Sequence, residues 1–413
     1  MTPRLVSIAE AGEQILAAVD PLPEERVPIE DALDRVLARD VAAAGDVPPF
    51  ASAAMDGYAV LAGPAGRTLR VVGESRAGVP SPLTVGSSEA VRTSTGAELP
   101  AGANAVIRQE QVEARGDEVT LRACVEVADD IRHRGEDLAA GVCVLGAGTT
   151  LGAAELAGAV AAGASELWCA RRPRVAILCT GTELRAPGEP LGPGEIHNAN
   201  AVTLRALATR CGALSAPALR LADDPATIET ALAAALAHSD VVVLTGGVSV
   251  GPHDHVKPAL DALGVEERFW GVAIQPGKPT WFGILAGRRT QKGAERPGTR
   301  DSTLVFGLPG NPVAAFVAFT LFVRPALLAL QGASAPEEQQ AELATAFTRH
   351  PGREQAITVR VEHDDARTVA VPNGPQGSNL ISSLLGADAL ALIPLGTGTL
   401  EPGAHVTLIA LPR

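Results

Sequence analysis

The sequence has few lysines, few aromatic residues and no closely spaced pair of cysteines. Three of its 34 basic residues are lysines, namely Lys257, Lys278 and Lys292, and aromatic residues make up 3% of the chain. The five cysteines contain no CxxC motif, so the sequence indicates neither a disulfide framework nor a zinc site, and a reducing cytoplasm fits best. The N-terminus has no signal-peptide pattern. The most apolar run, residues 313–323, ends at Arg324-Pro325 and is too short to span a bilayer.

The charge balance narrows the possible partners. The formal net charge of −13 argues against nucleic acid and against an anionic membrane as general partners. In a chain that carries nearly all its positive charge as arginine, we expect a lysine to mark a position that needs a compact ammonium group. Lys257 and Lys278 both follow glycine-rich segments, whereas Lys292 lies in a polar stretch that we expect to be a solvated loop.

The most informative segment of the sequence is residues 240–257, DVVVLTGGVSVGPHDHVK. The run from Val241 to Leu244 is apolar at every position, which predicts a strand of a parallel sheet buried on both faces. The glycines that follow, Gly246-Gly247 and Gly251, allow backbone N–H groups to approach an anion closely. A tight turn without a ligand is the alternative.

From Arg174 onward, strand-like and helical patterns alternate, which predicts a doubly wound, mostly parallel α/β domain. Ligands of such sheets bind in a crevice at the carboxyl ends of the strands. We therefore expect one cleft to be formed by the segments that follow the predicted strands, namely Glu183, Asp223-Asp224, the TGGVSVG loop with Asp254, Lys278 and the PGNP turn of residues 309–312. Asn311 is expected to cap the following helix, with Pro312 in its first turn.

The remaining segments predict a four-domain α/β protein. Ser7 and Glu10 form a capping box before a first helix, and a second helix is expected through Leu33, Val36 and Leu37. The predicted domains are a helical linker domain (residues 1–45 plus 140–170), a strand-rich inserted domain (46–139), the α/β domain (171–332) and a small C-terminal β domain (338–413).

The expected cleft has the chemistry of an oxyanion site. Glycine-rich loops and ammonium groups suit phosphate-like ligands, and the carboxylates of Glu183 and Asp254 suit a divalent metal beside them. The sequence has no GxGxxG after its first α/β strand and no GxxxxGK[ST], which argues against a dinucleotide dehydrogenase and a P-loop nucleotidase. Ser249 lies near His253 and His255, but no third residue orients a catalytic triad.

Seven motifs in a fixed order resemble one family. They are MDGYAV, STGAELPAGANAV, RGEDL, TGTEL, GGVSVGPHDHVK, QPGKP and GLPGNP. Together they resemble the molybdopterin molybdenumtransferase family, which includes MoeA proteins, the E domain of gephyrin and its plant counterpart. The resemblance implies insertion of molybdate into adenylated molybdopterin, with Mg²⁺ as cofactor and release of AMP. It also implies a cytoplasmic homodimer with an active site between subunits, and contact with the molybdopterin adenylyltransferase.

The resemblance assigns roles to individual residues. It implies catalytic roles for Glu183, Asp254, Lys278 and Asp137, of which Glu183 and Asp254 would bind the metal. The implied substrate-binding residues are Asp56, Thr95, Gly246, Gly247, Ser249, Gly251, Lys257, Asp224, Pro309, Pro312 and Arg353. Structural alternatives are capping or turn roles for the aspartates, and turn-shaping roles for the two prolines.

The sequence departs from the family pattern at three points. Ala51, Ser52 and Ala53 replace the usual Asp-Asn-Ser before the MDGY motif, Thr182 replaces an aspartate, and Gln275 replaces a lysine. We expect an arginine such as Arg132, Arg134 or Arg353 to compensate. Two other functions remain open: a paralogue that binds molybdopterin or molybdate with little catalysis, and a molybdopterin adenylyltransferase, although the latter is usually a single domain.

Overall fold

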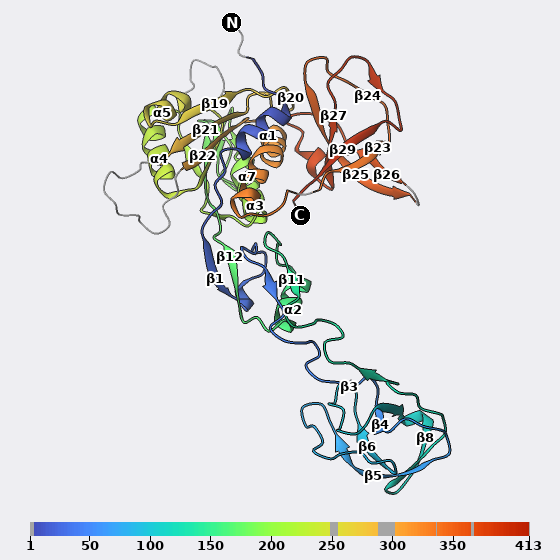
Figure 1. Cartoon of the computed structure of the whole chain (residues 1–413). Coiled ribbons are helices and arrows are strands. Elements are labelled where there is room, and N and C mark those ends of the chain that lie inside the picture. The colour runs from blue at the N-terminus through green and yellow to red at the C-terminus, as the bar shows by residue number, and fades with distance from the viewer. Residues whose placement is uncertain (1–3, 248–254, 288–301, 336, 365–366, 413) are drawn as a thin grey trace, which may run out of the picture.

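The computed structural model describes residues 4–412 except 248–254, 288–301, 336 and 365–366. Figure 1 shows an elongated molecule in which a narrow stem separates a distal lobe from a larger body. The larger body combines an α/β domain with a β-barrel, and both chain termini lie there. The two ends of the molecule therefore have separate cores.

The α/β domain is built on a seven-stranded mixed sheet in the order β16-β13-β18-β22-β21-β19, with β17 also paired to β13. The strands from β16 to β22 are parallel, and β21 is antiparallel to both of its neighbours. Their bounds are β13 Arg174–Thr180, β16 Leu214–Ser215, β17 Leu219–Leu221, β18 Val241–Thr245, β19 Glu266–Trp270, β21 Trp281–Ala286 and β22 Ser302–Leu308. Two short strands, β14 (Leu184–Arg185) and β15 (Ile196–His197), pair beyond the end of β13.

The central strand β18 confirms the prediction of burial on both faces. All five of its residues are buried, with Val241 and Val243 in one apolar cluster and Val242 and Leu244 in another. The helices that cover the sheet are α3 (Ala199–Arg210), α4 (Pro225–His238), α5 (Val256–Ala262), α6 (Pro312–Ala318) and α7 (Arg324–Leu330).

The expectation that the apolar segment is too short to span a bilayer was wrong in length, because the helix does not end at Arg324-Pro325. A π-helical segment, η3 (Phe319–Val323), joins α6 to α7, so that one helix runs from Pro312 to Leu330. The wider turn just before Pro325 is the kind of irregularity by which helices accommodate the missing proline N–H. By length and composition this helix could span a membrane, but 67% of its most apolar stretch is buried inside the protein. It packs against α1 (Ile8–Leu16) and α3 as the central helix of the α/β domain.

The C-terminal part forms a closed barrel of five strands, in which β25 pairs with both β26 and β27. A sixth strand, β20 (Ile274–Gln275), comes from the α/β domain and pairs in parallel with β25. The barrel strands are β23 Gln339–Leu343, β25 Glu354–Asp364, β26 Arg367–Pro372, β27 Ala389–Ile393 and β29 His405–Ala410. The short elements β24 (Phe347–Thr348), η4 (Ile381–Leu384) and β28 (Thr399–Leu400) complete this part.

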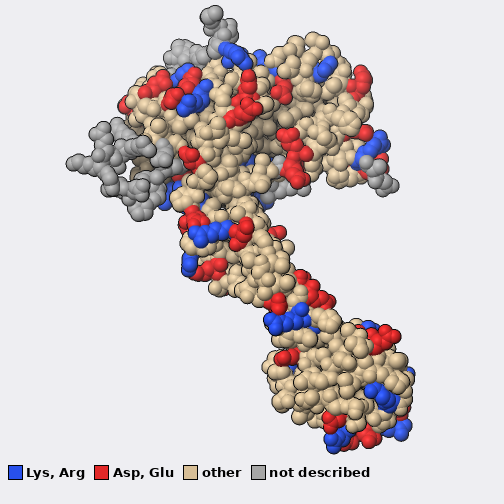
Figure 2. Space-filling model, viewed as in Figure 1, with Lys and Arg blue, Asp and Glu red and all other residues tan. Residues whose placement is uncertain are grey.

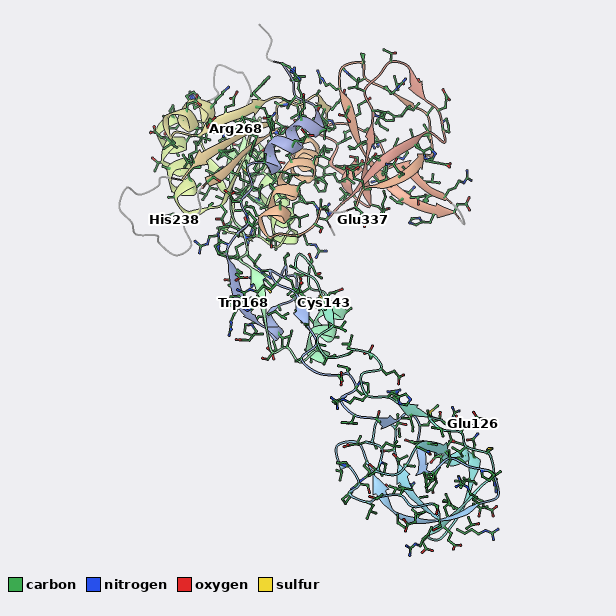
Figure 3. All side chains as sticks on the ribbon, in the orientation of Figure 1. Glu126, Cys143, Trp168, His238, Arg268 and Glu337 are labelled. Carbon is green, nitrogen blue, oxygen red and sulfur yellow. The ribbon has the colours of Figure 1, made fainter. Side chains whose placement is uncertain are left out.

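The stem is built mainly from two short strand pairs and one helix. It contains β1 (Glu24–Pro28) with β12 (Glu166–Ala170), β2 (Val41–Ala42) with β11 (Cys143–Leu145), and α2 (Ala153–Ala161). The guanidinium groups of Arg26 and Arg39 lie over the ring of Trp168, which is labelled in Figure 3, at 5.0 and 4.1 Å from its centre. Figure 2 shows acidic and basic side chains intermixed along the stem.

The second predicted helix was also wrong. The chain forms only a short 3-10 turn, η1 (Ile29–Asp31), and Asp34 adopts a positive φ of 60° that ends any helical run. Val36 and Leu37 then make isolated β-bridges and are buried in the stem.

The distal lobe is strand-rich. Its main sheet has the order β7-β4-β6-β5-β9-β8, and a separate pair, β3 with β10, faces the stem. The strands are β3 Ser52–Ala53, β4 Gly57–Val60, β5 Thr68–Ser75, β6 Glu89–Thr93, β7 Ala105–Arg108, β8 Val112–Arg115, β9 Glu118–Leu121 and β10 Ile131–Arg132, with a 3-10 turn, η2, at Gln109–Gln111.

Candidate active site

Three loops meet at the carboxyl ends of β13, β18 and β22. The Thr245 hydroxyl donates to the Pro309 carbonyl at 3.1 Å and accepts from the Asn200 amide at 2.9 Å. Asn200 also donates to the Gly310 carbonyl at 2.8 Å, so this amide ties the GLPGNP turn to the end of β18. The loops expected to form one cleft are therefore held together by side-chain bonds.

Gly246 and Gly247 are needed for this close approach. Gly246 has a φ of +82°, and a Cβ atom there would lie 2.4 Å from the Thr180 carbonyl oxygen. Gly247 has a φ of +63°, and its Cβ would meet the Val256 side chain at 2.8 Å. Larger residues would strain the backbone and separate the loops. Ser249, Gly251 and Asp254 lie outside the described residues.

The acidic residues near these loops have different environments. A Cβ atom on Gly181 would lie 2.6 Å from a Glu183 carboxylate oxygen, so this exposed carboxylate lies directly over the loop backbone. Asp223 accepts the Thr182 backbone N–H at 3.2 Å. Asp224 instead caps α4, and bonds from the Thr227 hydroxyl and N–H keep the pKa of its carboxyl below the usual value. Of the two aspartates, Asp223 thus contacts the TGTEL loop.

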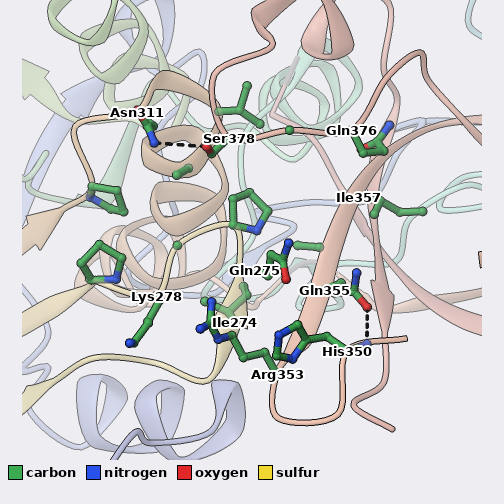
Figure 4. Close-up of a pocket in the computed structure, with 18 of the residues that line it drawn as sticks. Ile274, Gln275, Lys278, Asn311, His350, Arg353, Gln355, Ile357, Gln376 and Ser378 are labelled. Carbon is green, nitrogen blue, oxygen red and sulfur yellow. Dashed lines mark hydrogen bonds between the residues drawn. The ribbon is translucent and has the colours of Figure 1, made fainter. Parts of the chain in front are cut away.

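A cleft of about 620 Å³ separates the α/β domain from the barrel (Figure 4). Its geometry depends on the pairing of β20 with β25, in which Gln275 lies opposite Gln355 and the Glu354 N–H donates to the Ala273 carbonyl at 2.9 Å. This pairing places the Pro-Gly-Lys turn that follows β20 beside the tight turn that precedes β25. Lys278 and Arg353 therefore line the same cleft although they are distant in sequence.

No acidic side chain is among the described residues that line this cleft. The lining has two cationic side chains, Lys278 and Arg353, and no ion pair to either appears in the described part of the chain. The other polar lining side chains are Gln275, Asn311, His350, Gln355, Gln376 and Ser378. In a protein with a net charge of −13, such a lining favours a small oxyanion.

Several of these polar groups are held by hydrogen bonds. Gln376 accepts from the Thr358 N–H at 3.0 Å, and Gln355 accepts from the His350 N–H at 2.8 Å. Asn311 donates to the Ser378 hydroxyl at 3.1 Å and makes no side-chain cap to α6, so the predicted capping role was wrong. Pro312 does occupy the first turn of α6, as predicted. The barrel loop provides the competing partner that draws the Asn311 side chain away.

Two other predicted residues have partners of their own. Lys257 forms an ion pair with Glu267 at 2.7 Å, and the Trp281 indole N–H donates to the same carboxylate. In the distal lobe, Asp56 accepts both the Thr95 N–H at 2.7 Å and the Thr95 hydroxyl at 3.0 Å. The bond from the Thr95 N–H is the main cause of the lowered pKa of the Asp56 carboxyl.

The predicted site residues fall into two separate groups. Glu183, Asp223, Gly246, Gly247 and Pro309 belong to the α/β domain, and Lys278 and Arg353 line the adjoining cleft. Asp56, Thr95 and Asp137 lie in the distal lobe, at the other end of the stem (Figure 1). Within one chain, the stem keeps these groups apart.

Comparisons with known proteins cover both groups. Family models match in succession: the MoeA N-terminal region (domain I and II) over residues 6–163, the probable molybdopterin binding domain over 176–329, and the MoeA C-terminal region (domain IV) over 340–411. The chain is 33% identical to the molybdopterin molybdenumtransferase of Haemophilus influenzae, over 98% of both chains. The chain belongs to the molybdopterin molybdenumtransferase family.

Two further relatives agree with this assignment. Molybdopterin molybdenumtransferase 2 of Mycobacterium tuberculosis is 34% identical over 89% of this chain and 90% of its own length. The crystal structure of the MoeA protein of Pyrococcus horikoshii OT3 is similar with a TM-score of 0.80 and 30% identity, and covers 98% of this chain and 100% of that one. The multidomain architecture is therefore that of this transferase family.

Sequence reasoning missed several polar residues of this family member. Asn200 connects two site loops, and His350, Gln376 and Ser378 line the cleft. Asn200 gave a signal, because it lies in the first turn of α3, two residues after the helix-capping Asn198. The barrel residues gave none, since their place depends on how the barrel docks on the α/β domain.

The described residues contain no group of three metal-binding side chains. Glu183 is the one described member of the predicted metal pair. Its carboxylate, next to the Thr182 and Asp223 loops, offers the oxygen donors that Mg²⁺ prefers.

Proposed function

We propose that the protein is a molybdenumtransferase that inserts molybdate into adenylated molybdopterin and releases AMP. The observation that carries this proposal is the cleft between the α/β domain and the barrel, whose described lining has two cationic side chains and no acidic one. Molybdate is a small dianion whose four oxygens match converging ammonium, guanidinium, amide and hydroxyl donors. In this proposal Lys278 and Arg353 bind molybdate.

The loops of the α/β domain would bind the organic substrate. Gly246 and Gly247 carry no side chain of their own, so a phosphate could approach their backbone N–H groups. The GLPGNP turn connects this loop to the cleft, because Thr245 bonds to Pro309 while Pro309 and Asn311 line the cleft. The phosphate and the molybdate would therefore lie near each other.

Mg²⁺ fits this arrangement as an ion whose ligands would come partly from the protein and partly from the substrate. Mg²⁺ is usually held by one or two carboxylates together with substrate phosphates, so a three-residue protein site is not required. Glu183 and Asp254 would hold it, and it would neutralise charge on the phosphates. The role of the Glu183 carboxylate itself is to hold the positive charge of Mg²⁺ beside the loop of Gly246 and Gly247.

We further propose a cytoplasmic homodimer in which the distal lobe of one subunit completes the cleft of the other. The stem separates Asp56, Thr95 and Asp137 from Lys278 and Arg353 within one chain, so a joint site needs a second copy. Delivery of adenylated molybdopterin by the molybdopterin adenylyltransferase is the corresponding partner interaction.

A binding protein with little catalysis is the second candidate. The specific observation in its favour is Gln275, which lines the cleft where the family pattern has a lysine, so the cleft has one cation fewer. Thr182 likewise lacks a carboxylate, although Asp223 lies at hydrogen-bonding distance from its backbone.

One assay separates these functions. Adenylated molybdopterin is incubated with molybdate and Mg²⁺, and AMP and molybdenum cofactor are measured separately. We expect AMP release only when both molybdate and metal are present, and we expect Glu183→Gln to raise the Mg²⁺ concentration needed, with Glu189→Gln as the control. Bound pterin without AMP release under any metal would favour the binding protein, and adenylation of molybdopterin by ATP would favour the adenylyltransferase.

A further inference from the structure

The distal lobe contains its own pocket of about 570 Å³. Its lining comes from two segments, residues 47–52 and 132–137, and from Gly96. The segments are fastened together, because the Asp137 N–H donates to the Val47 carbonyl at 3.0 Å and the Gly135 N–H to the Pro48 carbonyl at 2.9 Å. The pocket is therefore a preformed feature of the lobe.

Phe50 is an unusual lining residue in this chain. Aromatic residues are scarce, and five of the eight phenylalanines are buried in the core of the α/β domain. Phe50 is 37% exposed and is the one phenylalanine among the exposed large apolar residues of the described chain. A single exposed apolar side chain is ordinary on a surface, but this one forms a pocket wall together with Val47 and Pro48.

Charged side chains also line this pocket, namely Arg132, Glu136 and Asp137. Glu136 accepts the His133 N–H at 2.7 Å, whereas the side chains of Arg132 and Asp137 make no ion pair or hydrogen bond within the described part of the chain. By contrast, the neighbouring Arg134 is neutralised by Asp46 at 2.6 Å and does not line the pocket. Arg132 is thus available to bind an anion, and Asp137 to accept hydrogen bonds.

We propose that this pocket binds a flat heteroaromatic ring of the substrate, stacked on Phe50, with Arg132 contacting a phosphate attached to it. A phenyl face, a hydrogen-bond acceptor and a guanidinium match a planar ring that has N–H donors and carries a phosphate. The proposal rests on the proposed function, whose substrate contains two such rings, an adenine and a pterin. Phe50 and Arg132 then determine which ring-bearing compounds the protein accepts.

The test compares substitutions of Phe50 in the full-length protein. Binding of AMP and of a free pterin is measured by calorimetry, together with KM and kcat for adenylated molybdopterin. Loss of a stacked ring weakens binding by about tenfold or more, so we expect Phe50→Ala and Phe50→Leu to lose that affinity for at least one ring ligand. Phe50→Tyr should retain it, and Val79→Ala, which removes an exposed apolar side chain of the same lobe, should change nothing.

A second pair of variants tests the anion contact. Arg132→Gln should weaken binding of AMP, or of a phosphorylated pterin, more than binding of the same ring without phosphate. Arg134→Gln is the matched control, because Arg134 is already paired and lies outside the pocket. Equal effects of the two substitutions would contradict the assignment of Arg132.

The outcomes separate this inference from the proposed function. If Phe50→Ala binds both ring ligands as tightly as the wild type does, the inference is overturned. It is also overturned if size-exclusion chromatography shows that Phe50→Ala changes only the oligomeric state. Loss of AMP binding assigns the pocket to adenine, and loss of pterin binding assigns it to the pterin. If the wild type inserts no molybdenum but Phe50→Ala still loses ring binding, the proposed function fails and the ring pocket stands.

Discussion

The two pockets of this molecule are built in different ways. The cleft beside the α/β domain collects its lining from segments far apart in sequence, and the two-residue strand β20 holds them in place against the barrel. The pocket of the distal lobe uses two short segments that backbone hydrogen bonds fasten together. The first therefore depends on domain docking, and the second only on the fold of one lobe.

The two linings also differ in chemistry. Among the described residues, the cleft is lined by cations and neutral polar groups without an acid, whereas the distal pocket is lined by two acids, a cation and an exposed phenyl ring. The former suits a small, symmetric oxyanion and the latter a planar organic ring. We infer that each pocket holds a different part of one reaction, and the predictions that follow treat them separately.

The largest expected effect is on the cleft. Arg353→Ala should lower turnover roughly 100-fold or more, because a guanidinium that stabilises an oxyanion by charge-assisted hydrogen bonds contributes several kcal/mol. Arg360→Ala, on β25 outside the cleft, should leave turnover within about twofold, as expected for a weak exposed ion pair. Ring-ligand binding in the distal pocket should be unchanged in both variants, and its loss in Arg353→Ala would show that the pockets are not independent.

Lys278→Arg should damage function nearly as much as Lys278→Ala. The side chain projects from a Gly-Lys-Pro turn whose Gly277 has a φ of +123°, and the turn lies between β20 and β21. We expect a planar guanidinium to fit poorly in the space that a compact ammonium occupies there. Turnover and molybdate affinity are compared at equal stability, with Lys292→Arg as the control. Near-normal turnover of Lys278→Arg would show that charge alone is required.

Gly246→Ala should be more destabilising than Gly66→Ala. Both glycines have a φ above +80°, but a Cβ at Gly66 meets nothing within 4 Å, whereas at Gly246 it meets the Thr180 carbonyl at 2.4 Å. Backbone strain alone costs about 1–2 kcal/mol, and the collision should add at least as much. Differential scanning calorimetry measures the midpoint temperature of unfolding for both variants. Equal shifts would mean that the loops at the ends of β13 and β18 can separate freely.

The smallest expected effect is on the pH dependence of stability, which two carboxyl groups near α1 should change in opposite directions. Burial raises the pKa of Glu354 above its ordinary 4.5, while the Ser7 N–H lowers that of Glu10. A carboxyl whose pKa is raised by folding contributes stability that is lost as pH rises above about 4.5. A carboxyl whose pKa is lowered by folding contributes stability that is lost as pH falls below about 4.5. Relative to Glu354→Gln, the wild type should lose stability from pH 4.5 towards 7. Relative to Glu10→Gln, it should lose stability from pH 4.5 towards 3. Urea unfolding at each pH measures both, and parallel curves would contradict the assignment.

The local features of the fold were predictable from the sequence. An unbroken apolar run identified β18 as buried on both faces, and Ser7 with Glu10 forms the expected capping box. The errors arose where tertiary contacts override local preference. Val36 and Leu37 form β-bridges with Thr150 and Cys169 in the stem, and Pro325 is accommodated by a π turn within a buried helix.

The site was predictable only in part for the same reason. Loops at the ends of parallel strands must converge, which correctly grouped Gly246 and Pro309. The cleft also depends on the pairing of Ile274 and Gln275 with β25, and a two-residue strand has no sequence periodicity. Arg353 and Asp137 were available only through the family resemblance, since nothing local relates them to Lys278.

Complementation between inactive subunits tests the central claim most directly. Asp137→Asn removes a distal-lobe group and Lys278→Ala a cleft group, so each homodimer should be inactive. After subunit exchange at equal amounts, half of the dimers are mixed and each mixed dimer has one intact site, which predicts about a quarter of wild-type turnover. Purified mixed dimers, carrying a different tag on each subunit, should reach about half. Mixed dimers that remain inactive, or a wild-type monomer with full turnover, would contradict a site shared between two chains.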